Sequence, residues 1–582
     1  MKALKKSIAI ALALCLCIGS FTIRAIASED MPNIHVYAPS GDDPSTPDNE
    51  SPDVESSKYQ VKVNGVAVPA IKYNQNGTNM DIARFASDSK TPEYEVSLIN
   101  GETISSIQVY PSHYYPAESM AISADKKSVK FSMSEKLSYA IVYINGTPSD
   151  QNGKPYLALI NDPLEAESEK PVKTASNVLD FKAFSTQYLL EHPINDVVGE
   201  VCLVGGTVQD YSNNDSKLYT LSYPEGVFVD YDSNQVTFPN KRARKANDVS
   251  DALQAALQKI KEDPALDTLY IPSGCYLWSG LRIEDWNGDV SNGGKPLIIY
   301  TEEGALLENR LSECKEAMEP AIWIKNSSFV TISGRGMHDG KGLINTDKDK
   351  KDARNTPHQG GSMLLSSQNI VFNDTYVRDV KQWNWECHTV ENIEYNNIKG
   401  LSPYNHAWVD GLDLTSGKNV TVNGAITLGN DDCFASGHYN PSNEFPARSI
   451  KEDKFTETIG AAAYYYNRDR MSWDTADSEN IVVKNSLHWT LGAGNGLRTG
   501  HNAFGYALKS YHFENFNVMN FTAGGWGITI QANSPYSKYE EFTFKDCYFN
   551  TDRVNGNIKI NGNASDTIES VEMDNVVFTK SA

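Results

Sequence analysis

Apolar and polar residues alternate in short runs along the first part of the chain, which is the period of half-buried β-strands. Turn pairs such as Asn100-Gly101 and Asn145-Gly146 separate the runs. The clearest runs are Tyr59–Val63, Tyr94–Leu98, Ile107–Tyr110, Val129–Phe131 and Tyr139–Ile144. We therefore predict an antiparallel β-sandwich over residues 58–190, with an unrelated carbohydrate-binding or wall-binding module as the alternative.

Helical periodicity appears next, over Asp248–Lys261, where apolar residues recur on one face and Asp248 can cap the first turn. A strand-like run and a Pro-x-Gly turn follow within Thr268–Gly274. This order resembles the N-terminal cap of a right-handed parallel β-helix. Such a cap shields the apolar end that the first coil would otherwise expose.

A loose repeat fills the rest of the chain, in which a polar residue, often asparagine, precedes an apolar-x-apolar strand. Most neighbouring copies are roughly 23 to 33 residues apart, about one coil of a β-helix. The copies begin at or beside Phe329, Asn369, Asn392, Asn419, Asn480, Phe513, Phe542 and Val571. Asparagine suits such corners because it tolerates a left-handed backbone and can stack on asparagines of adjacent coils. We predict an all-β chain with a right-handed parallel β-helix over residues 191–582, interrupted by an insertion at 439–477.

The first residues have the pattern of an export signal. Lysines precede an apolar run, and Ala25-Ile26-Ala27 offers a cleavage site. We predict a signal peptide at 1–27 and a disordered acidic linker at 28–57, so the mature protein is expected to be secreted and extracellular. Cysteines outside the signal peptide form no Cys-x-x-Cys pair, and we expect them to be mostly free, buried thiols.

Two short motifs carry the candidate chemistry. Asp410 lies in a Trp-Val-Asp-Gly motif, and Asp431 and Asp432 lie in a Gly-Asn-Asp-Asp motif about one coil further on. An inverting glycosidase needs a protonated acid and one or two carboxylates that activate water on the opposite face of the sugar, roughly 6.5–9.5 Å away. Crowded carboxylates raise at least one pKa, which keeps an acid protonated near neutral pH. The alternative is plain turn chemistry, because Asp-Gly and Asn-Asp also favour loops.

These motifs resemble two families of secreted enzymes. Polygalacturonases (glycoside hydrolase family 28) carry an Asn-Thr-Asp-Gly element, then Gly-Asp-Asp-Cys, Gly-His-Gly and Arg-Ile-Lys. The dextranase and isopullulanase family (family 49) has an Asn-Asp-Asp pair behind a β-sandwich. The resemblance implies that Asp431 is the general acid and that Asp410 and Asp432 hold the attacking water.

The chain departs from the polygalacturonase pattern where that family reads uronates. Asn495 stands at the expected histidine, and Thr529 and Gln531 stand where cations are expected. A uronate carboxylate buried without a positive partner would cost several kcal/mol. The formal net charge of −22 also disfavours polyanions. We therefore predict a neutral polysaccharide substrate, with an α-glucan such as dextran or pullulan first and a polygalacturonase-like pectin hydrolase as the alternative.

Further substrate-binding candidates flank the acids. Trp408 could stack on a sugar face, and Arg498 could orient carboxylates or hydroxyls. His438 and His501 are the remaining candidates, each of which could equally be a solvated loop residue.

We expect no cofactor and no metal. The other function classes left open are a calcium-dependent polysaccharide lyase and a non-catalytic polysaccharide-binding solenoid. Besides the polysaccharide we expect no partner: no nucleic acid, no membrane once the signal is removed, and a monomeric state.

Overall fold

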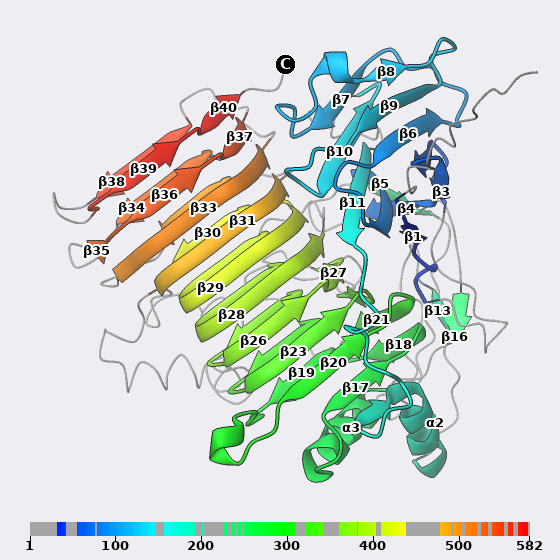
Figure 1. Cartoon of the computed structure of the whole chain (residues 1–582), viewed down its shortest axis with the longest axis vertical. Helices are drawn as coiled ribbons and strands as arrows, with labels where there is room; N and C mark the ends of the chain where they lie inside the picture. The colour runs from blue at the N-terminus through cyan, green and yellow to red at the C-terminus, as the bar shows by residue number, and fades with distance from the viewer. Residues whose placement is uncertain are drawn as a thin grey trace, which may run out of the picture.

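The computed structural model has a small β-sandwich beside a long coiled β-sheet (Figure 1). The structure describes residues 32–41, 55–75, 78–146, 156–192, 200–202, 226–229, 235–238, 243–245, 249–309, 320–340, 360–380, 382–402, 409–437, 478–490, 494–501, 507–520, 525–532, 538–551, 557–562 and 568–579. The insertion predicted at 439–477 and the signal peptide lie outside these residues.

Two sheets form the sandwich, and their facing apolar side chains make one core. One sheet has the order β3-β2-β6-β9-β8: Val66–Val68, Tyr59–Val63, Glu93–Leu98, Ser128–Ser132 and Ala121–Ile122. The other has the order β1-β5-β11-β10-β7, with β4 also paired to β5: Ile34–Val36, Thr78–Ser87, Tyr156–Pro163, Tyr139–Ile144, Ile107–Tyr110 and Ala70–Gln75. All five predicted runs are strands. The pairs are antiparallel except β11 with β5.

The structure corrects both sequence boundaries predicted for the sandwich. Strand β1 falls inside the range predicted as a linker, yet it pairs with β5 and is held by the buried Tyr37, whose hydroxyl donates to Asp162 at 2.7 Å. The sandwich also ends earlier than residue 190. Strand β12 (Val178–Asp180) pairs with β17 (Thr268–Ile271) of the coiled sheet, so it starts the β-helix.

The parallel strands wind into coils with three sheets, and each coil pairs in register with the next. The first sheet contains β19 (Leu281–Glu284), β22 (Ile322–Lys325), β25 (Ser362–Leu365), the starts of β28 (Trp385–Leu401) and β29 (Leu412–Gly429), β30 (Phe434–Gly437), β32 (Leu497–His501), β34 (Ile528–Ala532) and β38 (Ile558–Gly562). The β-helix prediction is confirmed.

The second sheet contains β17, β20 (Leu297–Thr301), β23 (Ser328–Gly334), β26 (Gln368–Asn373), the middles of β28 and β29, the starts of β31 (Ser478–Thr490) and β33 (Ala507–Asn520), β36 (Phe542–Lys545) and β39 (Val571–Asp574). The third contains β18 (Gly274–Trp278), β21 (Ala305–Asn309), β24 (Met337–Asp339), β27 (Tyr376–Arg378), the ends of β28, β29, β31 and β33, β37 (Tyr548–Thr551) and β40 (Val577–Thr579). Four short strands pair in separate hairpin-like sheets, β13 (Glu200–Cys202) with β16 (Ala243–Lys245) and β14 (Gly226–Val229) with β15 (Gln235–Phe238). Strand β35 (Lys538–Tyr539) pairs with β33.

Asparagines form a ladder along the corner before the second sheet, as predicted. Asn369, Asn392, Asn419 and Asn480 all have positive φ, between 53° and 57°. The side-chain amides of Asn392, Asn419 and Asn480 each donate to the asparagine of the previous coil, at 2.9 to 3.1 Å. The ladder fixes the register of the coils because a one-residue slip would move every asparagine out of the corner.

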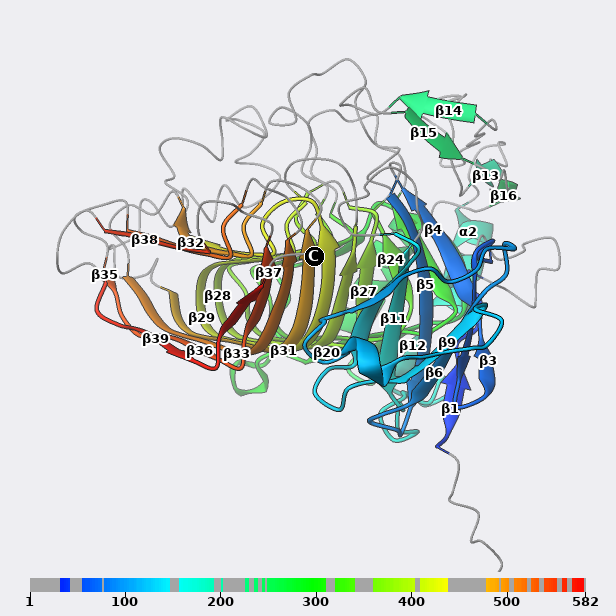
Figure 2. The same ribbon diagram turned by 90° about the horizontal axis from the view of Figure 1, so that it is seen from above.

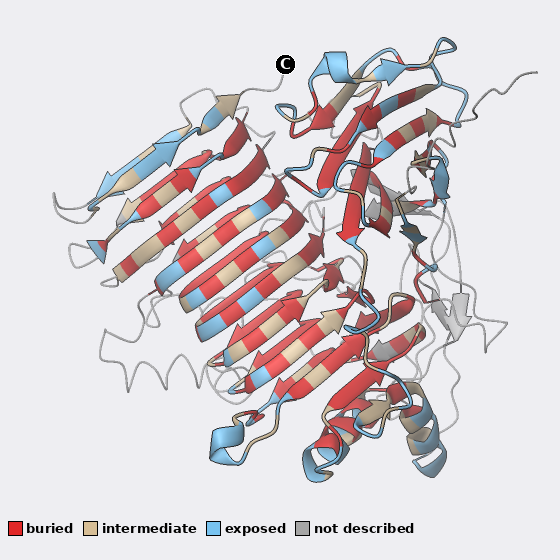
Figure 3. Cartoon of the chain, viewed as in Figure 1, coloured by how far each residue is buried: buried red, intermediate tan, exposed pale blue. Residues whose placement is uncertain are grey.

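Most residues along the parallel strands are buried (Figure 3), and apolar residues of the three sheets form the core of the coils. Two helices close the N-terminal end of this core. The predicted helix is α3 (Ser250–Glu262), which buries Leu253, Leu257 and Ile260. The second helix, α2 (Phe181–Glu191), was not predicted; its N-cap Asp180 accepts from the amide of Ala183 at 3.1 Å. Of the residues of α2, only Phe181 and Ser185 are buried.

The sandwich packs along the outer face of the third sheet (Figure 2). Trp489 stacks on Tyr143 and Tyr156 with ring centroids 5.7 Å apart in each pair. The apolar contact runs from Leu306 near the start of the β-helix to Tyr548 near its end. One face of the solenoid is therefore covered by its own N-terminal domain.

An ionic network is buried in the same junction. Lys399 and Asp162 are both fully buried and paired, and Asp162 also accepts from Tyr37, Tyr376 and Asn397. Burial acts to raise the pKa of Asp162, but the Lys399 ammonium and the Arg335 guanidinium outweigh it and lower the pKa to about 2.

Cys275, Cys387, Cys433 and Cys547 are free thiols, and all but Cys275 are buried. Cys202 and Cys314 are not among the side chains that the structure describes. No helix in the described part of the chain is long and apolar enough to cross a membrane.

Candidate active site

The three predicted acids lie at one edge of the first sheet, where successive coils enter their strands. Leu412 of β29 is in register with Phe434 of β30, so Asp410 and Asp432, each two residues earlier, occupy equivalent places on adjacent coils. The amide of Gly411 donates to the carbonyl of Asp432 at 2.8 Å, and the amide of Asp431 donates to the carbonyl of Val409 at 3.2 Å. The two motifs are thus fastened to each other through their backbones.

Glycines permit this close approach. A Cβ on Gly411 would lie 2.3 Å from the carbonyl oxygen of Cys433, and one on Gly494 would lie 1.9 Å from the carbonyl carbon of Asp431. Both distances are far shorter than a van der Waals contact. Side chains at these positions would therefore separate the coils that carry the acids.

Asp432 is surrounded by hydrogen-bond donors. Its Oδ1 accepts from both the amide and the side-chain Nδ2 of Asn495, the latter at 2.8 Å. Its Oδ2 accepts from Arg498 Nη1 at 3.3 Å. These donors match an ionised carboxylate, which accepts hydrogen bonds and donates none.

Asn495 is itself held in one orientation. Its Oδ1 accepts from the amide of Trp526 at 3.0 Å and from Thr529 Oγ1 at 3.2 Å. The amide nitrogen must then face Asp432. Two residues predicted to touch substrate, Asn495 and Thr529, therefore contact each other and fix an acid.

Asp410 is buried beside other carboxyl groups. Burial raises its pKa well above the usual value, and the charges of Asp413, Asp431 and Asp432 raise it further. The contact with Asp413 adds to the rise at Asp410, and the pKa of Asp413 is itself raised, first by its burial and then by the charge of Glu386. On the preceding coil, the fully buried Asn384 donates through Nδ2 to the backbone carbonyl of Asp410 at 2.9 Å. This bond fixes the backbone of Asp410 and leaves its carboxyl group to the neighbouring acids.

Three acidic or imidazole side chains near the site were not predicted: Asp413, Glu386 and His388. Asp413 is in register with Glu386 on the preceding coil, and both point outward because their strand neighbours are in the core. Glu386 Oε1 contacts His388 Nε2. The sequence could have predicted that Glu386 and Asp413 occupy equivalent positions on adjacent coils. They are 27 residues apart, the same step that separates the corner residues Asn392 and Asn419.

On the coils after the acids, outward-facing residues of the first sheet stand in register with one another, and we call this row the outward column. Ala435 pairs with Arg498, Arg498 with Thr529, and Thr529 with Lys559. The Lys559 ammonium lies 6.0 Å from the centre of the Trp526 ring. The next coil thus carries a cation beside Thr529, the position where the sequence showed none.

The remaining predicted residues fall into two groups. Gln531 is half-buried in β34, two residues beyond Thr529, and its carbonyl accepts from the Tyr539 hydroxyl at 2.8 Å. Trp408, His438 and the side chain of His501 lie outside what the structure describes.

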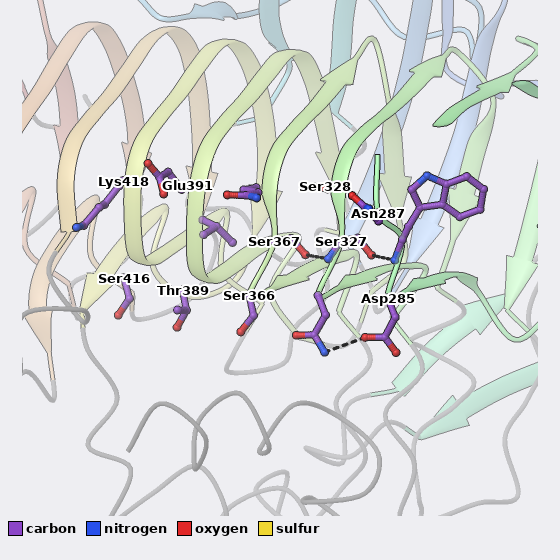
Figure 4. Close-up of a pocket in the computed structure, with 14 residues that line it drawn as sticks. Asp285, Asn287, Ser327, Ser328, Ser366, Ser367, Thr389, Glu391, Ser416 and Lys418 are labelled. Atoms are coloured by element: carbon purple, nitrogen blue, oxygen red, sulfur yellow. Dashed lines mark hydrogen bonds between the residues drawn. The ribbon is translucent and has the colours of Figure 1, made fainter. Parts of the chain in front are cut away.

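A polar cavity of about 630 Å³ lies at the far end of the same strands, at the corner into the second sheet (Figure 4). Ser366, Thr389 and Ser416 form a row in it, one from each successive coil. None of the predicted site residues lines this cavity.

Among the described residues no group of three or more histidine, cysteine, aspartate or glutamate side chains could hold a metal ion.

No family model and no curated protein matches the chain. Solved structures do match, at low identity. Dex49A from Penicillium minioluteum is 11% identical, with a TM-score of 0.43, and the match covers 94% of this chain and 93% of that one. The family 28 exopolygalacturonase of Yersinia enterocolitica is 11% identical, with a TM-score of 0.36, covering 89% and 86%. PfbA, a surface adhesin of Streptococcus pneumoniae, is 12% identical, with a TM-score of 0.34, covering 57% and 82%.

The resemblance to families 49 and 28 that the motifs predicted thus appears as a structural likeness over most of the chain, at low sequence identity.

Proposed function

We propose that the protein is a secreted glycoside hydrolase that cleaves a polysaccharide with inversion at the anomeric carbon. Asp431 acts as the general acid, and Asp432 and Asp410 hold the attacking water. The observation that carries the proposal is the meeting of Asp410, Asp431 and Asp432 at one edge of two adjacent coils. Asp432 has three donors around it, whereas Asp410 is buried among other acids.

Crowded carboxyls of this kind suit acid–base hydrolysis, because one group must keep a proton while another stays ionised. In the proposed step, water loses a proton to the base and attacks the anomeric carbon. The glycosidic bond breaks, and its oxygen takes the proton of Asp431. Arg498 lies 3.3 Å from Asp432 and balances part of its negative charge.

A neutral α-glucan remains the first choice of substrate. Thr529 donates a hydrogen bond to Asn495, and Asn495 donates one to Asp432. Both side chains are neutral, so neither supplies a positive partner for a uronate. A hydroxyl-rich substrate can instead use neutral donors and aromatic faces such as that of the half-buried Trp526.

A polygalacturonase-like activity is the second candidate, and one observation favours it. Arg498 and Lys559 flank Thr529 on neighbouring coils of the outward column, so a uronate bound there would meet cations on both sides. If this activity is present, Lys559→Ala should raise KM for polygalacturonate and leave the activity on dextran unchanged.

The deciding experiment is a reducing-sugar screen of the purified protein on dextran, pullulan, polygalacturonate, rhamnogalacturonan and arabinogalactan. We expect activity on a neutral glucan, an inverted anomer in early NMR spectra, and loss of activity in Asp431→Asn. A retained anomer would exclude the mechanism. Activity that depends on calcium and yields an unsaturated product would indicate a lyase, and binding without cleavage would indicate an adhesin.

A further inference from the structure

A second buried layer of ionisable groups lies behind Asp410, and the hydrolysis scheme above leaves it unused. Asp413 and Glu386 occupy the same position on adjacent coils of the first sheet. Leu412 and Leu414 on either side of Asp413 are in the core, as are Trp385 and Cys387 on either side of Glu386. Strand alternation therefore directs both carboxyls outward, toward the side on which Asp410 lies.

These groups are buried although they point outward. Glu386 is 0% exposed, Asp413 5% and Asp410 6%. The strongest charges acting on Asp410 and Asp413 are other carboxyls, namely Glu386, Asp431 and Asp432. Isolated charges are costly in such surroundings. Fewer than all of these carboxyls can therefore be ionised together.

Asp410 and Asp413 are neighbouring buried carboxyls, and each acts on the pKa of the other. Two ionised carboxylates only accept hydrogen bonds, so a bond between them requires one proton. Within the described chain, Asp410 Oδ1 and Asp413 Oδ2 have no further hydrogen-bond partner. A proton shared between the two carboxyls would leave Oδ1 of Asp410 as an acceptor.

We propose that Asp413 is a positioning residue that shares one proton with Asp410, so that the base in the hydrolysis is a carboxyl pair carrying a single negative charge. This inference rests on the proposed function. Glu386, hydrogen-bonded to His388, stands next to the pair as a neutral neighbour. Burial raises the pKa of Glu386 and lowers that of His388 to about 3, which favours a neutral hydrogen bond over an ion pair between them.

The proton count of the step is balanced. The pair begins with one proton and one negative charge. It takes the proton from the attacking water and becomes neutral, while the water oxygen forms its bond to the anomeric carbon. Asp431 gives its proton to the leaving oxygen and becomes ionised. The pair then releases one proton to solvent and Asp431 takes one up, which restores the starting state.

The titratable groups around the pair come from three coils. Glu386, His388 and the Cys387 thiol lie on β28, while Asp431, Asp432 and the Cys433 thiol precede or begin β30. Arg498 on β32 contacts Asp432. All but Arg498 and His388 are acids, so removing the charge of Asp413 should make Asp410 easier to ionise.

The test is the pH profile of kcat/KM in Asp413→Asn. Loss of the neighbouring charge lowers the pKa of Asp410, so Asp410 stays ionised at lower pH. The acidic limb should move toward lower pH by about one unit, together with a fall in kcat. Glu394→Gln, an exposed acid on the same strand as Glu386, is the matched control and should leave the limb in place. A fall in activity by the same factor at every pH would overturn the proposal and leave a structural role.

A second measurement needs no substrate. Difference infrared spectra report the carbonyl band of protonated carboxyl groups. Between pH 5 and pH 8 the wild type should retain buried protonated carboxyls, and Asp413→Asn should lose the one that titrates with Asp410. Glu386→Gln should remove one more such band without moving the pH profile. Spectra that are identical in wild type and Asp413→Asn would reject proton sharing. Inactivity of the wild type on every polysaccharide would reject the proposed function instead.

Discussion

The protein buries ionisable side chains in two places, and the neighbouring charges shift the carboxyl pKa values there in opposite directions. At the junction between the sandwich and the β-helix, Asp162 is surrounded by Lys399, Arg335 and hydroxyl donors, and its pKa falls to about 2. At the candidate site, Asp410 and Asp413 are surrounded by acids and their pKa values rise. The first arrangement is paired, as structural ion clusters usually are. The second keeps like charges together, a combination that is typical of catalytic sites.

The largest effect should come from breaking the pairing at the junction. Lys399→Met leaves Asp162 buried without its main partner, which should cost about 3–5 kcal/mol of unfolding free energy. Calorimetry should show a clear fall in Tm. Lys545→Met removes a lysine from an exposed ion pair with Glu514, at 3.0 Å, and should change Tm little. Equal effects of the two substitutions would mean that the junction does not depend on this pair.

Asp431→Asn should remove the proposed acid without disturbing the fold. General acid catalysis contributes typically 10²–10⁴-fold, so kcat should fall by about that factor while KM changes little. Tm should stay within about a degree of the wild type. A variant with near-normal turnover on the true substrate would remove Asp431 from the mechanism.

Asn495→Ala should have a smaller effect on catalysis, because it loosens Asp432 and removes no reacting group. It deletes the side-chain donor to Asp432 and keeps the backbone donor. We expect kcat to fall about 10- to 100-fold, with a smaller loss in Asn495→Gln if the amide can still reach the carboxylate. Unchanged kinetics in both variants would show that the backbone donor and Arg498 suffice.

The two clusters should also respond to pH with opposite signs. Because the folded pKa of Asp162 is depressed, its contribution to stability is present above about pH 4 and is lost as pH falls toward about 2. Because the folded pKa of Asp410 is raised, its protonated form favours the fold, and stability is lost as pH rises from about 4 through the folded value. Chemical denaturation of Asp162→Asn and Asp410→Asn across pH should separate these slopes.

The smallest expected effect is on the unfolding free energy of Asp410→Asn, and its sign should be opposite to that of Asp162→Asn. At neutral pH, Asp410→Asn should stabilise the protein by about 0.5–2 kcal/mol, because it removes a buried charge from among acids. The activity should be lost in the same variant. Asp162→Asn should destabilise. If both substitutions destabilise, the acid cluster at the candidate site is held as firmly as the junction.

Sequence periodicity predicted the strands and coils well because each coil buries a fixed apolar face. The asparagine corners and the five sandwich strands that were predicted follow directly from alternation and turn residues. The predicted acids meet on adjacent coils for the same reason, since a coil-length step returns the chain to the same edge. That placement leaves their catalytic roles a prediction.

Other features were beyond sequence reasoning because they depend on contacts across coils or between domains. Strand β1 sits in a polar, proline-rich region and is held by its pairing with β5 and by the contacts of His35 and Tyr37 with distant residues. Helix α2 packs Phe184, Tyr188 and Leu189 against the core while leaving them partly exposed, so its stability depends on the coil that it covers. Lys559 stands beside Thr529 only through the register of β34 with β38. Local patterns carry no information about such pairings.

A solenoid whose coils touch only their neighbours can open from either end, one coil at a time. Here the sandwich bridges the coils between Leu306 and Tyr548, so opening any of them must also peel away a domain that holds all the others. We therefore expect the coils in this span to unfold in a single cooperative transition and not one coil at a time. The last strands, β39 and β40, lie beyond it, and Met573 and Val577 are 38% and 40% exposed. Hydrogen exchange should be fast in these strands and uniformly slow in the coils that the sandwich spans.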